Sequence, residues 1–182
     1  MMAPWRSVIL ATLVAAVVSA DVPRLKPGDP LPPLSGETLN GQSVTLPAAL
    51  SGQPAVLLLG FTYGARQPVE AWSAWCRGPA GVAIACIELP MLGGLAKFAR
   101  PFIVNGMRKN TPAPLRDRVI TVTSKIGDWK SRVGHTAAAE NDAYLILVDR
   151  AGVVRWQAHG AFGDALAAAL AHEVASLPRS GG

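Results

Sequence analysis

The chain has 182 residues, half of them hydrophobic, and a formal net charge of +5. That length suits a single domain with a core of its own. Two cysteines are too few for a disulfide-stapled scaffold, which excludes that class. No recognised nucleic-acid motif accompanies the positive charge, so we expect no nucleic acid partner.

The first twenty residues have the pattern of a secretory signal peptide. Arg6 supplies a positive start, residues 7–18 are apolar, and small side chains occupy the cleavage positions before Asp21. We therefore expect cleavage after Ala20 and a mature chain in the periplasm or outside the cell. The alternative is an uncleaved membrane anchor, which the short apolar run disfavours.

The mature chain predicts alternating strands and helices after a proline-rich, extended lead-in at residues 21–33. Asn40 followed by Gly41 is typical of a hairpin turn. Apolar or β-branched runs predict strands at residues 55–61, 82–89, 119–123, 143–148 and 153–157. Helical spacing predicts helices at residues 67–75, 91–109, 128–132 and 162–177. Because Pro101 interrupts the second helix, we expect a kink or two successive helices there.

This order of elements predicts an α/β domain over residues 34–178, with a disordered tail at 179–182. Strand–helix alternation implies parallel pairing, and a closing hairpin makes the sheet mixed. We therefore expect a central mixed β-sheet flanked by helices, with an N-terminal β-hairpin. That arrangement is the thioredoxin-like layout.

Three stretches resemble the thioredoxin-like superfamily. A likeness to secreted redoxins lies in GDPLPPLSGETLNGQSVTLPAALSGQPAVLLLGF, residues 28–61. The turn of the Sco-type copper chaperones resembles GFTYGARQP, residues 60–68, and the superfamily's C-terminal hairpin resembles AYLILVDRAGVVRW, residues 143–156. This hairpin, with RDRVITVT at residues 116–123, is similar to the mitochondrial ATP synthase assembly factor family. Its members are thioredoxin-like, membrane-associated chaperones for a membrane subunit of the synthase.

The turn at residues 60–68 lacks the cysteines that the superfamily resemblance leads one to expect. The superfamily places its attacking thiolate at the N-terminus of the first helix, where the helix dipole lowers the thiol pKa. On a C-x-x-C register the two positions are Arg66 and Val69, and on a C-x-x-x-C register they are Gly64 and Pro68. The position of the superfamily's cis-proline is Ala143. Because thiol–disulfide exchange needs two sulfur atoms, we expect a redox-inactive protein rather than an enzyme.

Two cysteines and one histidine remain as candidates for other chemistry. Cys76 should end the first helix, and Cys86 should lie well along a strand that runs away from that end, too far for a native disulfide. His135 lies roughly where a Sco-like protein has its copper ligand, but one imidazole without thiolates is a poor copper(I) site. We expect no metal and no cofactor. The alternatives are a divergent thiol–disulfide oxidoreductase or peroxiredoxin-like enzyme, and a degenerate Sco-like metal chaperone.

Positive charge is concentrated between residues 97 and 132, where nine basic residues face two acidic ones, a net charge of +7. A basic cluster beside an amphipathic helix suits anionic headgroups or an acidic partner, and a solvated basic face is the plainer alternative. Most apolar residues of the helix should pack on the sheet, and a surplus including Met91 should contact a partner. The candidate contact residues are Phe98, Arg100, Phe102, Met107, Arg108, Lys109, Arg116 and Arg118.

The sequence therefore predicts a secreted, chaperone-like binding or assembly module that acts near a membrane. Its expected partner is a protein or an anionic membrane surface. The resemblance implies that the complex it helps to assemble is a membrane complex such as ATP synthase.

Overall fold

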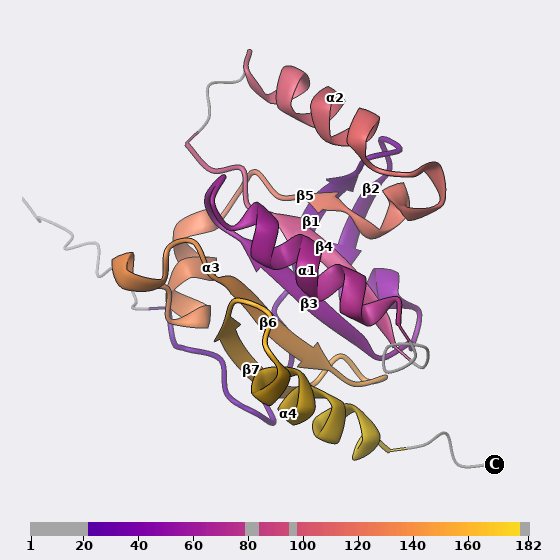
Figure 1. Ribbon diagram of the computed structural model, residues 1–182, viewed down its shortest axis with the longest axis vertical. Helices are drawn as coiled ribbons and strands as arrows, with labels where there is room; N and C mark the ends of the chain where they lie inside the picture. The colour runs from indigo at the N-terminus through magenta and orange to yellow at the C-terminus, as the bar shows by residue number, and fades with distance from the viewer. Residues whose placement is uncertain (1–21, 79–83, 95–97, 179–182) are drawn as a thin grey trace, which may run out of the picture.

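The computed structural model describes residues 22–78, 84–94 and 98–178 (Figure 1). The predictions for the signal peptide at residues 1–20, for Lys97 and for the tail at 179–182 concern residues outside these ranges. Among the described residues, no helix has both the length and the apolar character needed to cross a bilayer.

A four-stranded mixed sheet forms the centre of the molecule (Figure 1). Its strands, in the spatial order β4-β3-β6-β7, are Ala85–Pro90, Ala55–Gly60, Ala143–Val148 and Val154–Gly160. Strands β3 and β4 are parallel, whereas β6 runs antiparallel to both β3 and β7. The mixed sheet predicted from the sequence is therefore confirmed.

The sheet is buried on both faces. Alternate residues of each strand point to opposite sides, so each strand contributes to both cores. On one face, Leu57 and Tyr144 join a core that includes Trp129 of α3 (Ile126–Val133). On the other face, the core is closed by α1 (Arg66–Cys76) and α4 (Asp164–Ala175). Both cores consist of residues between Leu25 and Leu177, so a chain that begins at Asp21 keeps all of them.

The turn between β6 and β7 is held by one buried carboxylate. Asp149 accepts hydrogen bonds of 2.9 Å from the N–H groups of both Ala151 and Val153. Its second oxygen lies 2.6 Å from the Arg155 guanidinium. Burial opposes ionisation of Asp149, but the hydrogen bonds from Val153, Arg155 and Ala151 outweigh it and lower the pKa. The acidic residue of the LVDRAG stretch therefore fixes the hairpin.

A second, three-stranded sheet has the order β2-β1-β5, with strands Ser43–Leu46, Leu34–Thr38 and Ile120–Thr121. The hairpin predicted around Asn40 is confirmed. The predicted third strand of the central sheet is only two residues long. Single parallel bridges, Val119 with Glu88 and Val122 with Met91, join this segment to the β4 edge of the central sheet, and its two strand residues pair with β1. Gly36 permits this pairing, because a Cβ atom there would lie 2.6 Å from the Thr121 carbonyl oxygen. Short 3-10 turns complete the chain at Ala48–Leu50, Ala113–Arg118 and Ala137–Ala139.

Helix α2 (Arg100–Asn110) differs most from the sequence prediction. Pro101 lies in its first turn, where the missing N–H costs nothing, so it starts the helix rather than kinking it. No residue of α2 is buried, and Figure 1 shows it at the margin of the molecule beside the hairpin. The expectation that its apolar residues pack on the central sheet is therefore wrong. Met91, expected as surplus, is 3% exposed and belongs to the core.

Candidate functional site

The turn between β3 and α1 faces the loop that precedes β6. The Thr62 hydroxyl lies 2.7 Å from the Asn141 side-chain oxygen and 3.2 Å from the Glu140 carbonyl oxygen. It also accepts a hydrogen bond from the Ala65 N–H. A Cβ atom on Gly64 would collide with the end of the Asn141 side chain, so a larger residue there would displace Asn141 from its contact with Thr62. The turn is therefore closed by a side-chain network in which no sulfur takes part.

The other turn positions named from the sequence have packing or surface roles. Arg66 is exposed, and its Nε lies 2.7 Å from the Glu70 carboxylate, a hydrogen bond that raises the Arg66 pKa further. Pro68 is half-buried, and Val69 packs in the core beneath α1. Ala143 is buried as the first residue of β6. None of these side chains is a nucleophile, so the turn cannot carry out thiol exchange.

Aromatic rings from four separate segments gather beside this turn. Tyr144 stacks on His135, with ring centroids 5.6 Å apart, and on His159, at 5.1 Å. Phe61 meets His135 and Tyr144 edge-on. His159 Nδ1 lies 2.7 Å from an Asp142 carboxylate oxygen. The cluster stabilises this end of the sheet by packing, because offset and edge-on rings attract one another.

His135 lies beside the turn, as the Sco resemblance implies, but it has no thiolate near it. Its Nε2 is shielded from solvent and has no hydrogen-bond partner among the described residues. Burial, followed by the positive charge of Lys130, lowers the His135 pKa. Within residues 22–78, 84–94 and 98–178, no three metal-binding side chains come together. The expectation that the protein binds no metal stays a prediction.

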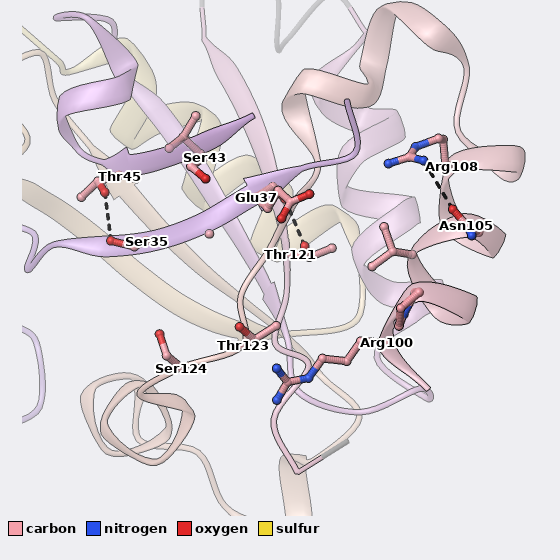
Figure 2. A pocket seen from close by; sticks show the side chains of 14 residues that line it. Ser35, Glu37, Ser43, Thr45, Arg100, Asn105, Arg108, Thr121, Thr123 and Ser124 are labelled. Carbon is pink, nitrogen blue, oxygen red and sulfur yellow. Dashed lines mark hydrogen bonds between the residues drawn. The ribbon is translucent and has the colours of Figure 1, made fainter. Parts of the chain in front are cut away.

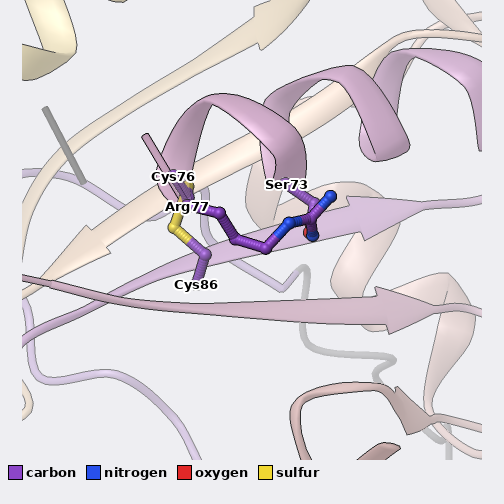
Figure 3. The surroundings of a disulfide bond; sticks show 4 residues. All are labelled: Ser73, Cys76, Arg77 and Cys86. Carbon is purple, nitrogen blue, oxygen red and sulfur yellow. A yellow bond between two sulfur atoms is a disulfide. The ribbon is translucent and has the colours of Figure 1, made fainter. Parts of the chain in front are cut away.

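Cys76 and Cys86 are joined by a disulfide bond, so the expectation that they lie too far apart is wrong (Figure 3). Their Cα atoms are 6.1 Å apart, within the range that a disulfide spans. Cys76 ends α1, and Cys86 is only the second residue of β4, which begins at Ala85. The sequence prediction started this strand at residue 82 and thereby moved Cys86 too far from the helix end.

The disulfide is enclosed, with 5% of Cys76 and 6% of Cys86 exposed. Glu88 lines a small cavity beside it, together with Ser73 and Arg77. Burial raises the pKa of the Glu88 carboxyl, while Ser73 and the charge of Arg77 act in the opposite direction. Arg77 also donates a 2.9 Å hydrogen bond to the Ser73 hydroxyl (Figure 3). The one signal in the sequence for the surroundings of this disulfide is Glu88, an acidic residue within an otherwise apolar strand.

Two phenylalanines at α2 are almost fully exposed. Phe98 precedes the helix and is 88% exposed, and Phe102 in its first turns is 83% exposed. Met107 is half-buried. Large apolar side chains that are exposed together in one patch mark interaction surfaces. Phe98 and Phe102 therefore remain contact candidates, whereas part of the Met107 side chain is covered by the protein itself.

The basic candidates have different local contacts. Arg108 fastens α2 to the hairpin, because its Nε donates a 2.6 Å hydrogen bond to the Leu39 carbonyl oxygen. Arg116 donates to the Thr111 carbonyl oxygen, and Arg118 lines the cavity beside Glu88. Arg100 and Lys109 lie on α2 itself. The basic cluster of the sequence is thus divided among α2, the 3-10 turn after it, and α3.

No family model and no curated protein sequence matches this chain. Among solved structures, it is similar to DsbE from Chlorobium tepidum, assigned to thiol:disulfide interchange, with a TM-score of 0.55 and 18% identity. That match covers 84% of this chain and 97% of the other. The chain is also similar to BsSco, a member of the Sco family of cytochrome c oxidase assembly proteins, with a TM-score of 0.54 and 14% identity over 86% and 99% of the two chains.

A further similarity is to StoA from Bacillus subtilis, with a TM-score of 0.51 and 12% identity over 81% and 99% of the chains. Matches of this length and low identity establish the fold and not the activity. The chain has a thioredoxin-like fold, and the predicted fold class is confirmed. Sequence reasoning missed Thr62 and Asn141, because a hydrogen bond between two distant loops leaves no local pattern.

Proposed function

We propose that this chain is a secreted, thioredoxin-like binding module that associates with an anionic membrane surface and carries out no dithiol exchange. The exposure of α2 is the observation that supports the proposal most strongly. This basic helix has no buried residue, and Phe98 and Phe102 are almost fully exposed. A helix that contributes so little to the core is explained by contact with something outside the chain.

The chemistry of α2 suits the interface of an anionic bilayer. Each exposed Lys or Arg near such a surface contributes on the order of 1 kcal/mol of attraction, which salt screens within about 8–10 Å. Lys109 is exposed on α2 and supplies this charge, and the half-buried Arg100 and Arg108 add to it in part. Phe98 and Phe102 supply apolar contact that salt does not screen. Raising the salt concentration should therefore weaken the contribution of charge and leave the apolar contribution in place.

The absence of thiol exchange is supported by where the sulfur atoms lie. The turn that faces the loop before β6 contains Thr62, Gly64 and Arg66, and no cysteine. Cys76 and Cys86 are bonded to each other and enclosed at the opposite end of α1. A thiolate must form and be reachable to attack a disulfide, and neither condition holds for an enclosed, oxidised pair.

An assembly role is the finer form of this proposal. BsSco, which shares the fold, belongs to a family of cytochrome c oxidase assembly proteins. The hairpin at residues 143–156 resembles the ATP synthase assembly factor family. We therefore expect a periplasmic or extracellular module that holds a membrane-complex subunit while α2 keeps it at the bilayer.

A second candidate is a thiol–disulfide oxidoreductase that uses Cys76 and Cys86. The observation in its favour is Glu88, an ionisable group with a raised pKa beside the disulfide. If this candidate is right, the chain reduces insulin disulfides with dithiothreitol as the reductant, faster than dithiothreitol alone, and Cys76→Ser abolishes the difference. If the binding proposal is right, the rate with the chain equals the rate without it.

Vesicle sedimentation tests the binding proposal. A chain beginning at Asp21 should sediment with vesicles that contain phosphatidylglycerol or phosphatidylserine and stay in solution with pure phosphatidylcholine. Phe98→Ser/Phe102→Ser should weaken binding most at high salt. Tyr63→Ser is the matched control, because Tyr63 is an 87% exposed aromatic residue far from α2 in the sequence. Equal binding by the two variants, or no binding by the parent chain, rejects the proposal.

A further inference from the structure

A groove of about 840 Å³ separates α2 from the β1–β2 hairpin (Figure 2). Its volume is within the range of small-molecule sites, roughly 300–1,000 Å³. Arg100, Asn105 and Arg108 line it from α2. The other polar lining residues, from the hairpin and the segment after β5, are Ser35, Glu37, Ser43, Thr45, Thr121, Thr123 and Ser124.

Polar side chains line both walls of the groove, alongside the apolar residues Val44, Pro101 and Val104. In the hairpin, Leu34 and Leu46 point into the core, so the intervening residues Ser35 and Thr45 point the other way, toward α2. Their hydroxyls lie 2.9 Å apart as a cross-strand pair (Figure 2). No residue of α2 is buried against this hairpin.

The Nε atom of Arg100 lacks a hydrogen-bond acceptor among the described residues, and it is shielded from solvent. Figure 2 shows the Arg100 side chain reaching toward the end of the groove that holds Thr123 and Ser124. The Glu37 carboxylate lies at the hairpin end, near Gly41. Because the Nε is closed to solvent, a ligand in the groove would meet Arg100 through the outer nitrogen atoms of its guanidinium group, which Figure 2 shows at the end of the side chain.

We propose that this groove binds a phosphate ester of a hydroxylated alcohol, with the phosphate at Arg100. Guanidinium groups bind phosphate oxygens through paired, charge-assisted hydrogen bonds. Thr123 and Ser124 line the end of the groove toward which Arg100 reaches and add hydroxyl groups there, and Ser43, Thr45 and Asn105 offer partners for an alcohol. Glycerol phosphate has this chemistry, both as a free solute and as the headgroup of phosphatidylglycerol.

The inference deepens the proposed function and rests on it where the source is a lipid, because α2 is at once a wall of the groove and the membrane-binding helix. Headgroup capture by Arg100 would make binding selective among anionic lipids of equal charge. Lys109 lies on α2 but does not line the groove, so it provides attraction without selectivity.

The test compares vesicles of equal surface charge that contain phosphatidylglycerol or phosphatidylserine, and titrates free glycerol 3-phosphate by calorimetry. The parent chain should prefer phosphatidylglycerol, and Arg100→Gln should lower that preference about tenfold or more, as expected for a hydrogen bond to a charged group. Lys109→Gln should weaken binding to both lipids equally. Thr123→Val should reduce the preference without changing thermal stability, because Thr123 is exposed and makes no side-chain hydrogen bond within the described residues.

The outcomes separate the two proposals. Equal binding to both lipids, with no heat from glycerol 3-phosphate, overturns the groove site and leaves the membrane-binding function standing. No binding to any vesicle, together with glycerol 3-phosphate binding that Arg100→Gln removes, supports the groove with a free solute and rejects the membrane function. Absence of both overturns both proposals.

Discussion

Breaking the Cys76–Cys86 bond should destabilise the fold without changing what the protein binds. The bond closes a loop with a sequence separation of 10 residues. In the chain-entropy description, a loop of that length restricts the unfolded chain by about 9 cal/mol/K, which is about 2.7 kcal/mol at 25 °C. A domain of this size is stable by roughly 5–15 kcal/mol, so the bond supplies a large share.

The measurement is thermal and urea unfolding of the chain from Asp21, with and without dithiothreitol. A loss of about 2.7 kcal/mol corresponds to a fall of roughly 5–11 °C in Tm for a domain of this length. Cys76→Ala/Cys86→Ala should show at least the same fall in the absence of reductant. Dithiothreitol should leave the Tm of this double variant unchanged, which controls for other effects of the reductant.

The reasoning is refuted if reduction changes the Tm by less than about 2 °C, since the loop-closure contribution would then be absent. It is also refuted if the reduced chain gains insulin-reducing activity that the double variant lacks. In that case the bond belongs to a catalytic cycle and the second candidate function replaces the first.

Four further predictions follow from single residues. Asp149→Asn should reduce the loss of unfolding free energy that urea unfolding measures as the pH is lowered. The Asp149 pKa is lowered in the folded chain, so the stabilisation from its carboxylate is complete above about pH 4 and is lost as the pH falls through the lowered pKa. Glu88→Gln should raise stability at pH 8, because burial raises the Glu88 pKa and the parent chain therefore loses stability as the pH rises through it. Phe102→Ala should change the unfolding free energy by less than about 0.5 kcal/mol, because Phe102 is exposed, while weakening vesicle binding. Arg66→Ala should likewise stay within about 0.5 kcal/mol in urea unfolding, since its ion pair with Glu70 is exposed, and a marked fall in Tm would contradict this.

The parts of the fold that the sequence predicted well are those dictated by local pattern. The run at residues 55–61 is apolar at every position up to Gly60, and such a short run between turn residues is typical of a strand covered on both faces. The LVDRAG stretch carries its own turn, fixed by Asp149. In both cases the information lies within a few neighbouring residues.

The parts that failed depend on contacts between distant segments. The segment at 119–123 was expected to be a regular strand, but only two of its residues form one; they pair with β1, and Gly36 permits that pairing from far along the chain. For α2, the apolar spacing indicated a core face, but the surface it meets is the polar side of the hairpin. The Cys76–Cys86 bond depended on the first residue of β4, and strand ends are poorly marked in sequence. The groove at Arg100 has no sequence motif, because its walls come from separate elements.

The central claim is that the protein works by binding through α2 and not by exchanging its disulfide. The most direct measurement compares Cys76→Ala/Cys86→Ala with Phe98→Ser/Phe102→Ser by sedimentation with anionic vesicles, at a temperature where circular dichroism shows both variants folded. The account predicts that the chain without its disulfide binds like the parent, and that the α2 variant loses binding, most clearly at high salt. Loss of binding in the disulfide variant with full binding in the α2 variant would contradict it.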